Sequence, residues 1–374
     1  QTFSVIIALI SMMKRKTGIH LKKTDFRPNK KVMWQILRVG FPVAIQDGCI
    51  QIAFIIITVI ANHRGLNDAA AVGIVEKMIS AIFIIPSSML ATVSALSAQN
   101  IGAGKPGVAY QARQLGLIFN AVVGVMMSVF LAVFSGKILE IVSIAPALFT
   151  PAETYLKIVG GACFLNALIP IFSSYLRVFG YTRQSLFASI TGNIINFILN
   201  SVFLFVMNWG VMGVAIATVI SRVINLIMVA AMGAVLVKAK NAPERESSRK
   251  ILGQIIKIGF PSACETALYN IAMTLVVRFM NQMDADGMNV TARSYTLQIA
   301  NFSYCVGAAL AQANAIMTGW RIGAKEFEEC DKGTKKAAIY GVITATCFSV
   351  MFALTGYFHR RSTDDKSGCK IACR

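Results

Sequence analysis

Two segments of the chain repeat almost the same eight residues: Gln35-Ile-Leu-Arg-Val-Gly-Phe-Pro42 and Gln254-Ile-Ile-Lys-Ile-Gly-Phe-Pro261. A second match relates Ile101-Gly-Ala-Gly-Lys105 to Ile322-Gly-Ala-Lys325, at a separation of 221 residues against 219 for the first. In each copy a basic segment leads through Gly-Phe-Pro into a long apolar run, and a Gly-Ala turn follows two helices later. Two matches at nearly one separation predict that the chain contains a duplicated helical unit.

The composition is that of a membrane protein. Apolar residues make up 56% of the chain and charged residues only 14%, against roughly 45–50% and about 25% in soluble globular proteins. These values exclude a soluble globular chain, and the high hydrophobicity excludes a disordered one. The formal net charge of +19 would suit nucleic-acid binding, but the basic residues lie in short loops between apolar runs. There they indicate membrane orientation, so we reject nucleic acid as a partner.

The apolar runs set the domain organisation, because a helix needs about 20 apolar residues to cross a bilayer. Runs of sufficient length cover 38–61, 72–98, 112–135, 152–176, 185–207, 212–237, 258–282, 291–318 and 337–358. The sequence therefore predicts an all-α polytopic membrane protein. Its expected regions are the tail of a truncated transmembrane helix (1–13), a basic cytoplasmic linker (14–35), a six-helix transmembrane half (36–240), a second cytoplasmic linker (241–257), the first three helices of a second half (258–358) and a polar tail (359–374).

The loops give an orientation. Basic residues are dense and sparse in alternate loops, as the positive-inside rule requires, so the basic loops are expected in the cytoplasm of a bacterial cell, beneath its inner membrane. Six helices fit into one repeat, and an even number means that both copies insert the same way up. Such parallel repeats are related by an axis along the membrane normal and enclose a cavity between them. This arrangement is typical of alternating-access transporters.

Further motifs follow one another in a definite order. They are Ser97-Ala-Gln-Asn-Ile-Gly-Ala-Gly-Lys105, Leu176-Arg-Val-Phe-Gly-Tyr-Thr-Arg183, Gly192-Asn-Ile-Ile-Asn-Phe-Ile-Leu-Asn200 and Gly210-Val-Met-Gly-Val-Ala-Ile-Ala-Thr218. With the two Gly-Phe-Pro segments, they resemble the multidrug and toxic compound extrusion (MATE) transporters over roughly residues 30–358. The resemblance implies a MATE-like six-helix bundle followed by the first three helices of a second bundle. Because the family pattern is twelve helices in two sixes, we expect an incomplete or mosaic chain.

Asp47 and Glu265 are the first candidate site residues. They follow Pro42 and Pro261 by five and four residues, on the two opening helices. An ionisable side chain in a membrane span usually faces a cavity or a partner, and the resemblance implies that acids on these helices bind the coupling cation or a cationic substrate in a central cleft. The alternative is that both acids lie near the cytoplasmic interface and are hydrated, because five helical residues span only about 7 Å.

Asn196 and Asn200 form a second candidate pair. Residues four apart share one face of a helix, and family members often carry an Asn followed by an Asp at this spacing. Asn200 stands at the Asp position, where its amide cannot take up a proton although its oxygen can coordinate a cation. The alternative is hydrogen bonding between helices, which is common for Asn in membranes. Asn166 and Thr218 are weaker candidates for residues of the same site.

Other conspicuous residues are expected to have structural roles. Glu76 and Arg222 lie within apolar runs, where a structural role is the favoured interpretation. Pro86, Pro170 and Gly160 interrupt spans and predict bends, which either let a cavity open or are static packing features.

The predicted function is a cation-coupled antiporter that exports organic, often cationic, compounds. The sequence holds no HExxH, GxSxG or ATP-binding pattern, so we expect no enzyme, no cofactor and no metal other than a possible Na⁺ at the same acids. The coupling ion would be H⁺ or Na⁺, the partners a lipid bilayer and a small organic substrate, and the working state a monomer. One alternative is a lipid-linked oligosaccharide flippase or polysaccharide exporter, which would need a strongly basic cleft. The other is a non-functional transporter fragment.

Overall fold

The computed structural model describes residues 30–62, 66–142, 144–237, 242–283, 288–344, 346–347 and 350–351. Within these residues the regular elements are helices. The first unit comprises α2 (Lys30–Asn62), α3 (Leu66–Ile82), α4 (Ile84–Gly102), α5 (Pro106–Val133), α6 (Ser135–Ile141), α7 (Pro146–Tyr155), η2 (Leu156–Gly160), α8 (Phe164–Val178), α9 (Thr182–Ser201), η3 (Val202–Val206) and α10 (Gly210–Leu236). The second comprises α11 (Ser248–Met283), α12 (Met288–Gly323) and a helix over 327–344.

Two helices extend into the segments expected to be linkers. Helices α2 and α11 begin there, at Lys30 and Ser248. A helix gains one hydrogen bond for each residue added after its nucleus, so these helices continue through polar residues outside their apolar runs. The predicted helix tail (1–13) and polar tail (359–374) lie outside the described residues.

Three helical stretches of the described chain are long and apolar enough to cross a membrane alone: 106–133, 182–206 and 210–236. Two bent helix pairs raise this number to five if each pair is one span. The remaining predicted spans coincide with α2, α11, α12 and the helix from residue 327, whose described residues do not meet that test. The fold class is the predicted one, a polytopic bundle of membrane helices.

The bent pairs have identifiable causes. Between α3 and α4 the axis turns by 51° at Phe83, three residues before Pro86, whose missing N–H cannot bond within the helix. Between α7–η2 and α8 the axis turns by 46°, beyond Gly160. The backbone N–H of Phe164, at the start of α8, donates to Ser128 Oγ on α5 at 2.9 Å. A neighbouring helix thus bonds a group that the break would leave unpaired in lipid. The predicted bending point Pro170 lies inside α8.

Helix α5 shows how these helices pack. Small or polar residues repeat every four positions on its buried face, namely Ala112, Gly116, Asn120, Gly124 and Ser128. The opposite face exposes large apolar side chains, including Ile118, Val122, Met126 and Val133. Small residues let helix backbones approach closely in a membrane, where lipid replaces water around the outer face. The helix therefore carries its largest apolar side chains on the outside.

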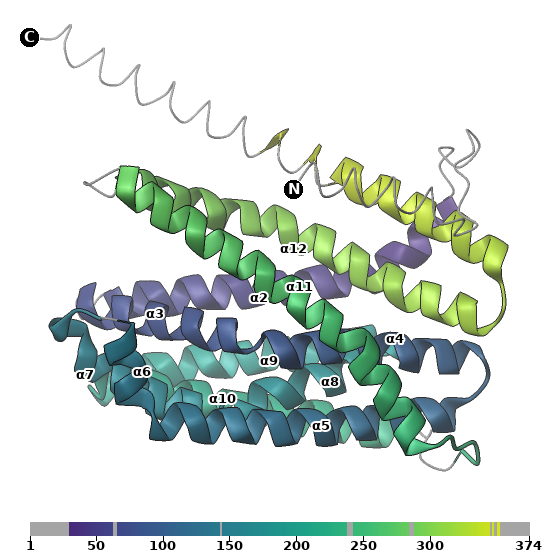
Figure 1. Cartoon of the computed structure of the whole chain (residues 1–374), viewed down its shortest axis with the longest axis horizontal. Coiled ribbons are helices and arrows are strands. Elements are labelled where there is room, and N and C mark those ends of the chain that lie inside the picture. Colours follow the sequence, from purple (N-terminus) through teal and green to yellow (C-terminus); the bar gives the residue numbers. More distant parts are fainter. Residues whose placement is uncertain are drawn as a thin grey trace, which may run out of the picture.

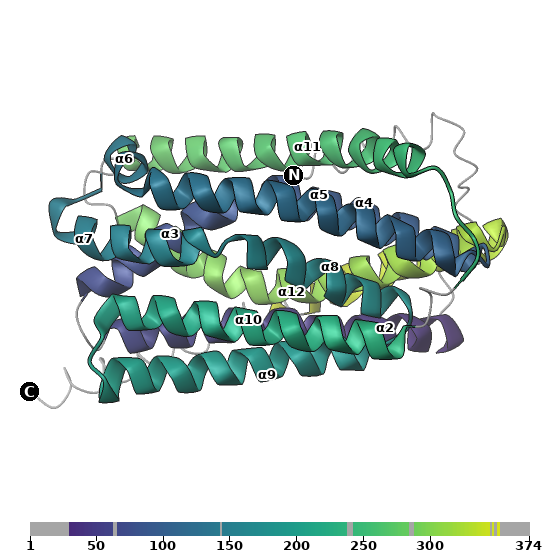
Figure 2. The same cartoon turned by 90° about the horizontal axis from the view of Figure 1, so that it is seen from below.

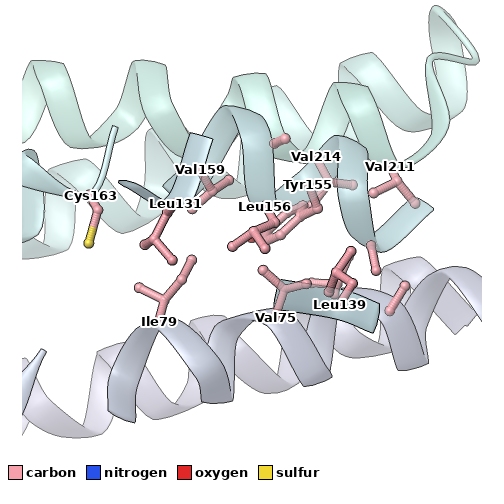
Figure 3. Close-up of a cluster of buried hydrophobic side chains, with 14 of the residues drawn as sticks. Val75, Ile79, Leu131, Leu139, Tyr155, Leu156, Val159, Cys163, Val211 and Val214 are labelled. Carbon is pink, nitrogen blue, oxygen red and sulfur yellow. The ribbon is translucent and has the colours of Figure 1, made fainter. Parts of the chain in front are cut away.

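The first unit surrounds α8, and the second lies across it. Helix α8 packs against α5 and α10, as Figure 2 shows, while α9 packs on α10 and α2. Helix α11 runs diagonally across α4 and α5 (Figure 1), and α12 lies along α2 and α4. The largest apolar cluster joins α3, α5, α7, η2 and α10, with Val75 and Ile79 facing Tyr155 and Leu156 (Figure 3). This cluster packs α3 against α7, η2 and α10.

Candidate functional site

A cavity of about 900 Å³ lies between the two units. Its wall is formed by α2, α3, α4, α8, α9 and α10 of the first unit together with α11 and α12 of the second. Most of the wall is apolar or carries hydroxyl and amide groups. Among the described residues, its charged side chains are Asp47, Glu76, Arg177 and Arg222.

Asp47 is half-buried on α2 and lines the cavity. Within the described part of the chain, its carboxylate makes no hydrogen bond and no ion pair shorter than 4.0 Å. The preceding residue, Gln46, is buried and donates from Nε2 to Ser189 Oγ on α9 at 2.8 Å. This bond joins α2 to α9 one residue before Asp47.

Arg177 lies in the last turn of α8 and is only 8% exposed. Its Nη1 donates to Gln46 Oε1 at 3.4 Å, which is its single hydrogen bond to a described residue. Gln46 therefore connects α8 to α9 through both ends of its amide. Asp47 and Arg177 line the same cavity without direct contact.

Glu76 and Arg222 form the second pair of charges. Arg222 Nη2 on α10 lies 3.4 Å from Glu76 Oε1 on α3. The same oxygen accepts a hydrogen bond from the buried Tyr155 hydroxyl at 2.8 Å. The structure thus pairs two residues for which the sequence indicated structural roles, and it places both on the cavity wall. Their opposite charges within two separate apolar runs are the sequence feature that could have suggested this contact.

The asparagine pair forms a polar ladder between α9 and α10. Asn200 is buried and donates from Nδ2 to Asn196 Oδ1 at 3.0 Å. Asn196 Nδ2 in turn donates to Ser221 Oγ at 3.0 Å, and Ser221 donates to the Thr218 carbonyl at 2.9 Å. Asn196, Thr218 and Asn166 line the cavity, whereas Asn200 does not.

Glu265 does not reach the cavity, and the expectation that it shares a cleft with Asp47 differs from the structure. Its side chain is exposed, while Thr266 and Asn270 of the same helix line the wall. The reason is helical register, because one residue rotates a side chain by about 100°. The repeat separation of 219 residues makes Thr266, and not Glu265, the counterpart of Asp47.

The two Gly-Ala turns of the repeat meet in space and close one end of the cavity. A Cβ atom on Gly102 would collide with the Trp320 carbonyl oxygen, and one on Gly323 would collide with that of Gln99. These contacts are equivalent under the 221-residue repeat, and Ala98 touches its own counterpart, Gly319.

The end of the cavity lies about one helical turn before these contacts, where Ala95 and Ile316 still belong to its wall. Helices α4 and α12 therefore close this end as a reciprocal pair.

Similar proteins identify the family. The MatE family model matches residues 42–202 and 261–372. An uncharacterized transporter of Bacillus subtilis, YisQ, is 28% identical over 79% of this chain and 66% of its own length. A probable multidrug resistance protein NorM of Thermotoga maritima is 25% identical over 70% of this chain and 59% of its own. The chain thus spans less than two thirds of these two relatives.

Solved structures share the fold. An outward-facing multidrug resistance MATE transporter superposes with a TM-score of 0.75 at 21% identity, covering 88% of this chain and 74% of that one. A MATE structure in the straight conformation gives a TM-score of 0.76 at 20% identity, with coverage of 88% and 75%. The chain belongs to the MATE family, a family of membrane transporters and not of enzymes.

Proposed function

We propose that this protein is a cation-coupled antiporter that exports organic compounds by alternating access. The observation that carries the proposal is the cavity of about 900 Å³ between the two repeats, with the Asp47 carboxylate on its wall. Drug-sized ligands occupy sites of roughly 300–1,000 Å³ with mostly apolar walls and a few polar groups. The names of relatives, among them probable multidrug resistance proteins, agree with a substrate of this kind.

Closure at one end supports alternating access. The reciprocal contact of α4 and α12 lies beside Lys105 and Lys325, on the side where the basic loops are expected in the cytoplasm. In this proposal the conformation is closed toward the cytoplasm of a bacterial cell, across its inner membrane. A rotation of one unit against the other would part the two Gly-Ala turns and open that side.

Asp47 is the proposed coupling residue. Its carboxylate has no described partner, so it is available to a proton, to Na⁺ or to a positively charged group of the substrate. Glu76, in contrast, already bonds Arg222 and Tyr155. Entry of the ion at Asp47 would remove the partner of the substrate's positive charge and release it. No resident cofactor is needed for this cycle, and a monomer is sufficient.

The test is dye movement in proteoliposomes. Purified protein would be reconstituted with ethidium or rhodamine 123, and either a proton gradient or a Na⁺ gradient would be imposed. We expect one gradient to drive the dye against its concentration, and Asp47→Asn to stop that movement. Protein-free liposomes and the exposed-site variant Arg183→Gln are the controls. Dye movement that ignores both gradients would contradict the antiporter proposal.

A further inference from the structure

We propose that the cavity selects zwitterionic substrates, with Asp47 binding the positive group and Arg177 binding a carboxylate. This inference rests on the proposed function and names its substrate class. It arises from the balance of charges on the wall, which carries two carboxylates and two guanidinium groups among the described residues. A cavity for purely cationic compounds would show an excess of acids, and a cavity for anions would show an excess of bases.

One pair of these charges is already in contact. Glu76 Oε1 lies 3.4 Å from Arg222 Nη2 and also accepts from the Tyr155 hydroxyl, while Arg222 Nη1 is buried and has no hydrogen-bond partner among the described residues. The other two, Asp47 and Arg177, face the same cavity without touching each other. A ligand with one charge would pair with one of them and leave the other without an ion pair. A ligand with both charges can neutralise both.

The guanidinium group of Arg177 is suited to binding a carboxylate. This group has five N–H donors, yet it makes a single hydrogen bond to a described residue, at the long distance of 3.4 Å. It is more than nine-tenths buried, and a buried charge is costly unless it is paired. A carboxylate can accept two parallel hydrogen bonds from guanidinium, the strongest pairing open to this group.

Gln46 supports the assignment. Its amide oxygen accepts from Arg177, while its amide nitrogen is occupied by Ser189. Gln46 therefore holds the guanidinium through Nη1, and Arg177 itself lines the cavity. Because Asp47 is the next residue of α2, the same contact joins the two helix segments that carry the opposite charges. Binding by such a pair also suits antiport, since protonation of Asp47 would release the positive group of the ligand.

The experiment compares two dyes that differ at one position. Rhodamine 110 carries a free carboxylate, and rhodamine 123 is its methyl ester with the same cationic ring system. Binding to the purified full chain would be measured by fluorescence polarisation without a gradient. We expect wild-type protein to bind rhodamine 110 at least about tenfold more tightly, because only this dye offers Arg177 a carboxylate for charge-assisted hydrogen bonds.

Variants locate the preference. Arg177→Gln should bring the two affinities within about twofold of each other while leaving that for rhodamine 123 nearly unchanged. Arg177→Lys, which keeps the charge, should retain a preference for rhodamine 110. Arg183→Gln, an exposed arginine in the first turn of α9, is the matched control and should bind as wild type does. Monodispersity of each variant on size exclusion checks its fold.

The outcomes separate this inference from the function on which it rests. Equal affinities in wild-type protein, or an unchanged preference in a folded Arg177→Gln, would overturn the zwitterion proposal even if dyes move along a gradient. If Arg177→Gln does not fold, the wild-type ratio and Arg177→Lys decide the matter. A wild-type preference that Arg177→Gln removes, without gradient-driven movement of either dye, would support the ligand class and contradict the antiporter.

Discussion

Helices α2 and α11 start with the same Gly-Phe-Pro motif but bring different chemistry to the cavity. On α2 the fifth residue after the proline is Asp47, which lines the wall. On α11 the fifth residue is Thr266, which lines the same wall, while the acid Glu265 is exposed one position earlier. The repeat thus preserves the backbone arrangement and not the charge. The carboxylate of the opening helices enters the cavity from the first unit alone.

The largest expected difference is between the two acids themselves. Asp47→Asn should reduce gradient-driven dye efflux by roughly 100-fold, near the upper range of coupling between sites. Glu265→Gln should stay within about twofold of wild type, as an exposed substitution does. Initial efflux rates, normalised to the amount of protein in the liposomes, measure both. A strong loss from Glu265→Gln would show that the acids act as equivalents after all.

The Gly-Ala turns give the next largest effect. Gly323→Ala places a methyl group against the Gln99 carbonyl and should lower the free energy of unfolding by about 1–3 kcal/mol. Gly307→Ala, on the same helix α12 with open space around it, is the matched control. It should be neutral or raise stability by up to about 1 kcal/mol. Unfolding in mixed micelles followed by circular dichroism measures both variants, and equal losses would argue against the reciprocal contact.

Moving the acid between the repeats tests their equivalence more finely. The double variant Asp47→Thr with Thr266→Asp returns a carboxylate to the same cavity from the other unit. Its gradient-driven efflux should exceed that of Asp47→Thr alone by roughly tenfold, because the cavity again contains an ionisable group. The single variant Thr266→Asp is the control for added charge. No recovery in the double variant would show that the position beside Gln46 and Arg177 is essential.

The smallest effect is expected at the asparagine ladder. Asn200→Ala removes one hydrogen bond between side chains on α9 and should cost about 0.6 kcal/mol, the mean for such bonds in a membrane protein. Efflux should remain within about twofold, since Asn200 does not line the cavity. If Asn200→Ala instead changed the ion dependence of efflux, the coupling ion would act at the predicted asparagine pair as well as at Asp47.

Much of the fold followed from the sequence because hydrophobic runs and repeats act locally. The polytopic class and the Gly-Ala turns are visible in the chain order, and the apolar runs between 72 and 237 coincide with α3–α4, α5, α7–α8, α9 and α10. Bends were predicted near Pro86 and Gly160, although the first one lies at Phe83. A proline disturbs the turn that precedes it, so the break falls upstream of the residue that causes it.

The site was harder to predict because it depends on side-chain direction. Counting from the two prolines placed Asp47 and Glu265 together, but a difference of one residue turns a side chain by about 100°. The pairing of Glu76 with Arg222 joins residues 146 positions apart, and no local pattern specifies such a contact. Arg177 was visible only as part of a family motif, and its burial beside Gln46 requires the packed structure.

The reciprocal closure at the Gly-Ala turns has a consequence for cooperativity. Gly102 against Trp320 and Gly323 against Gln99 are copies of one contact on either side of an approximate two-fold axis. A rocking motion of the units about a line perpendicular to that axis and away from the turns separates both contacts together, so breaking one contact alone would lose packing without opening a passage. Close-packed interfaces of this kind favour two discrete arrangements over a continuous range.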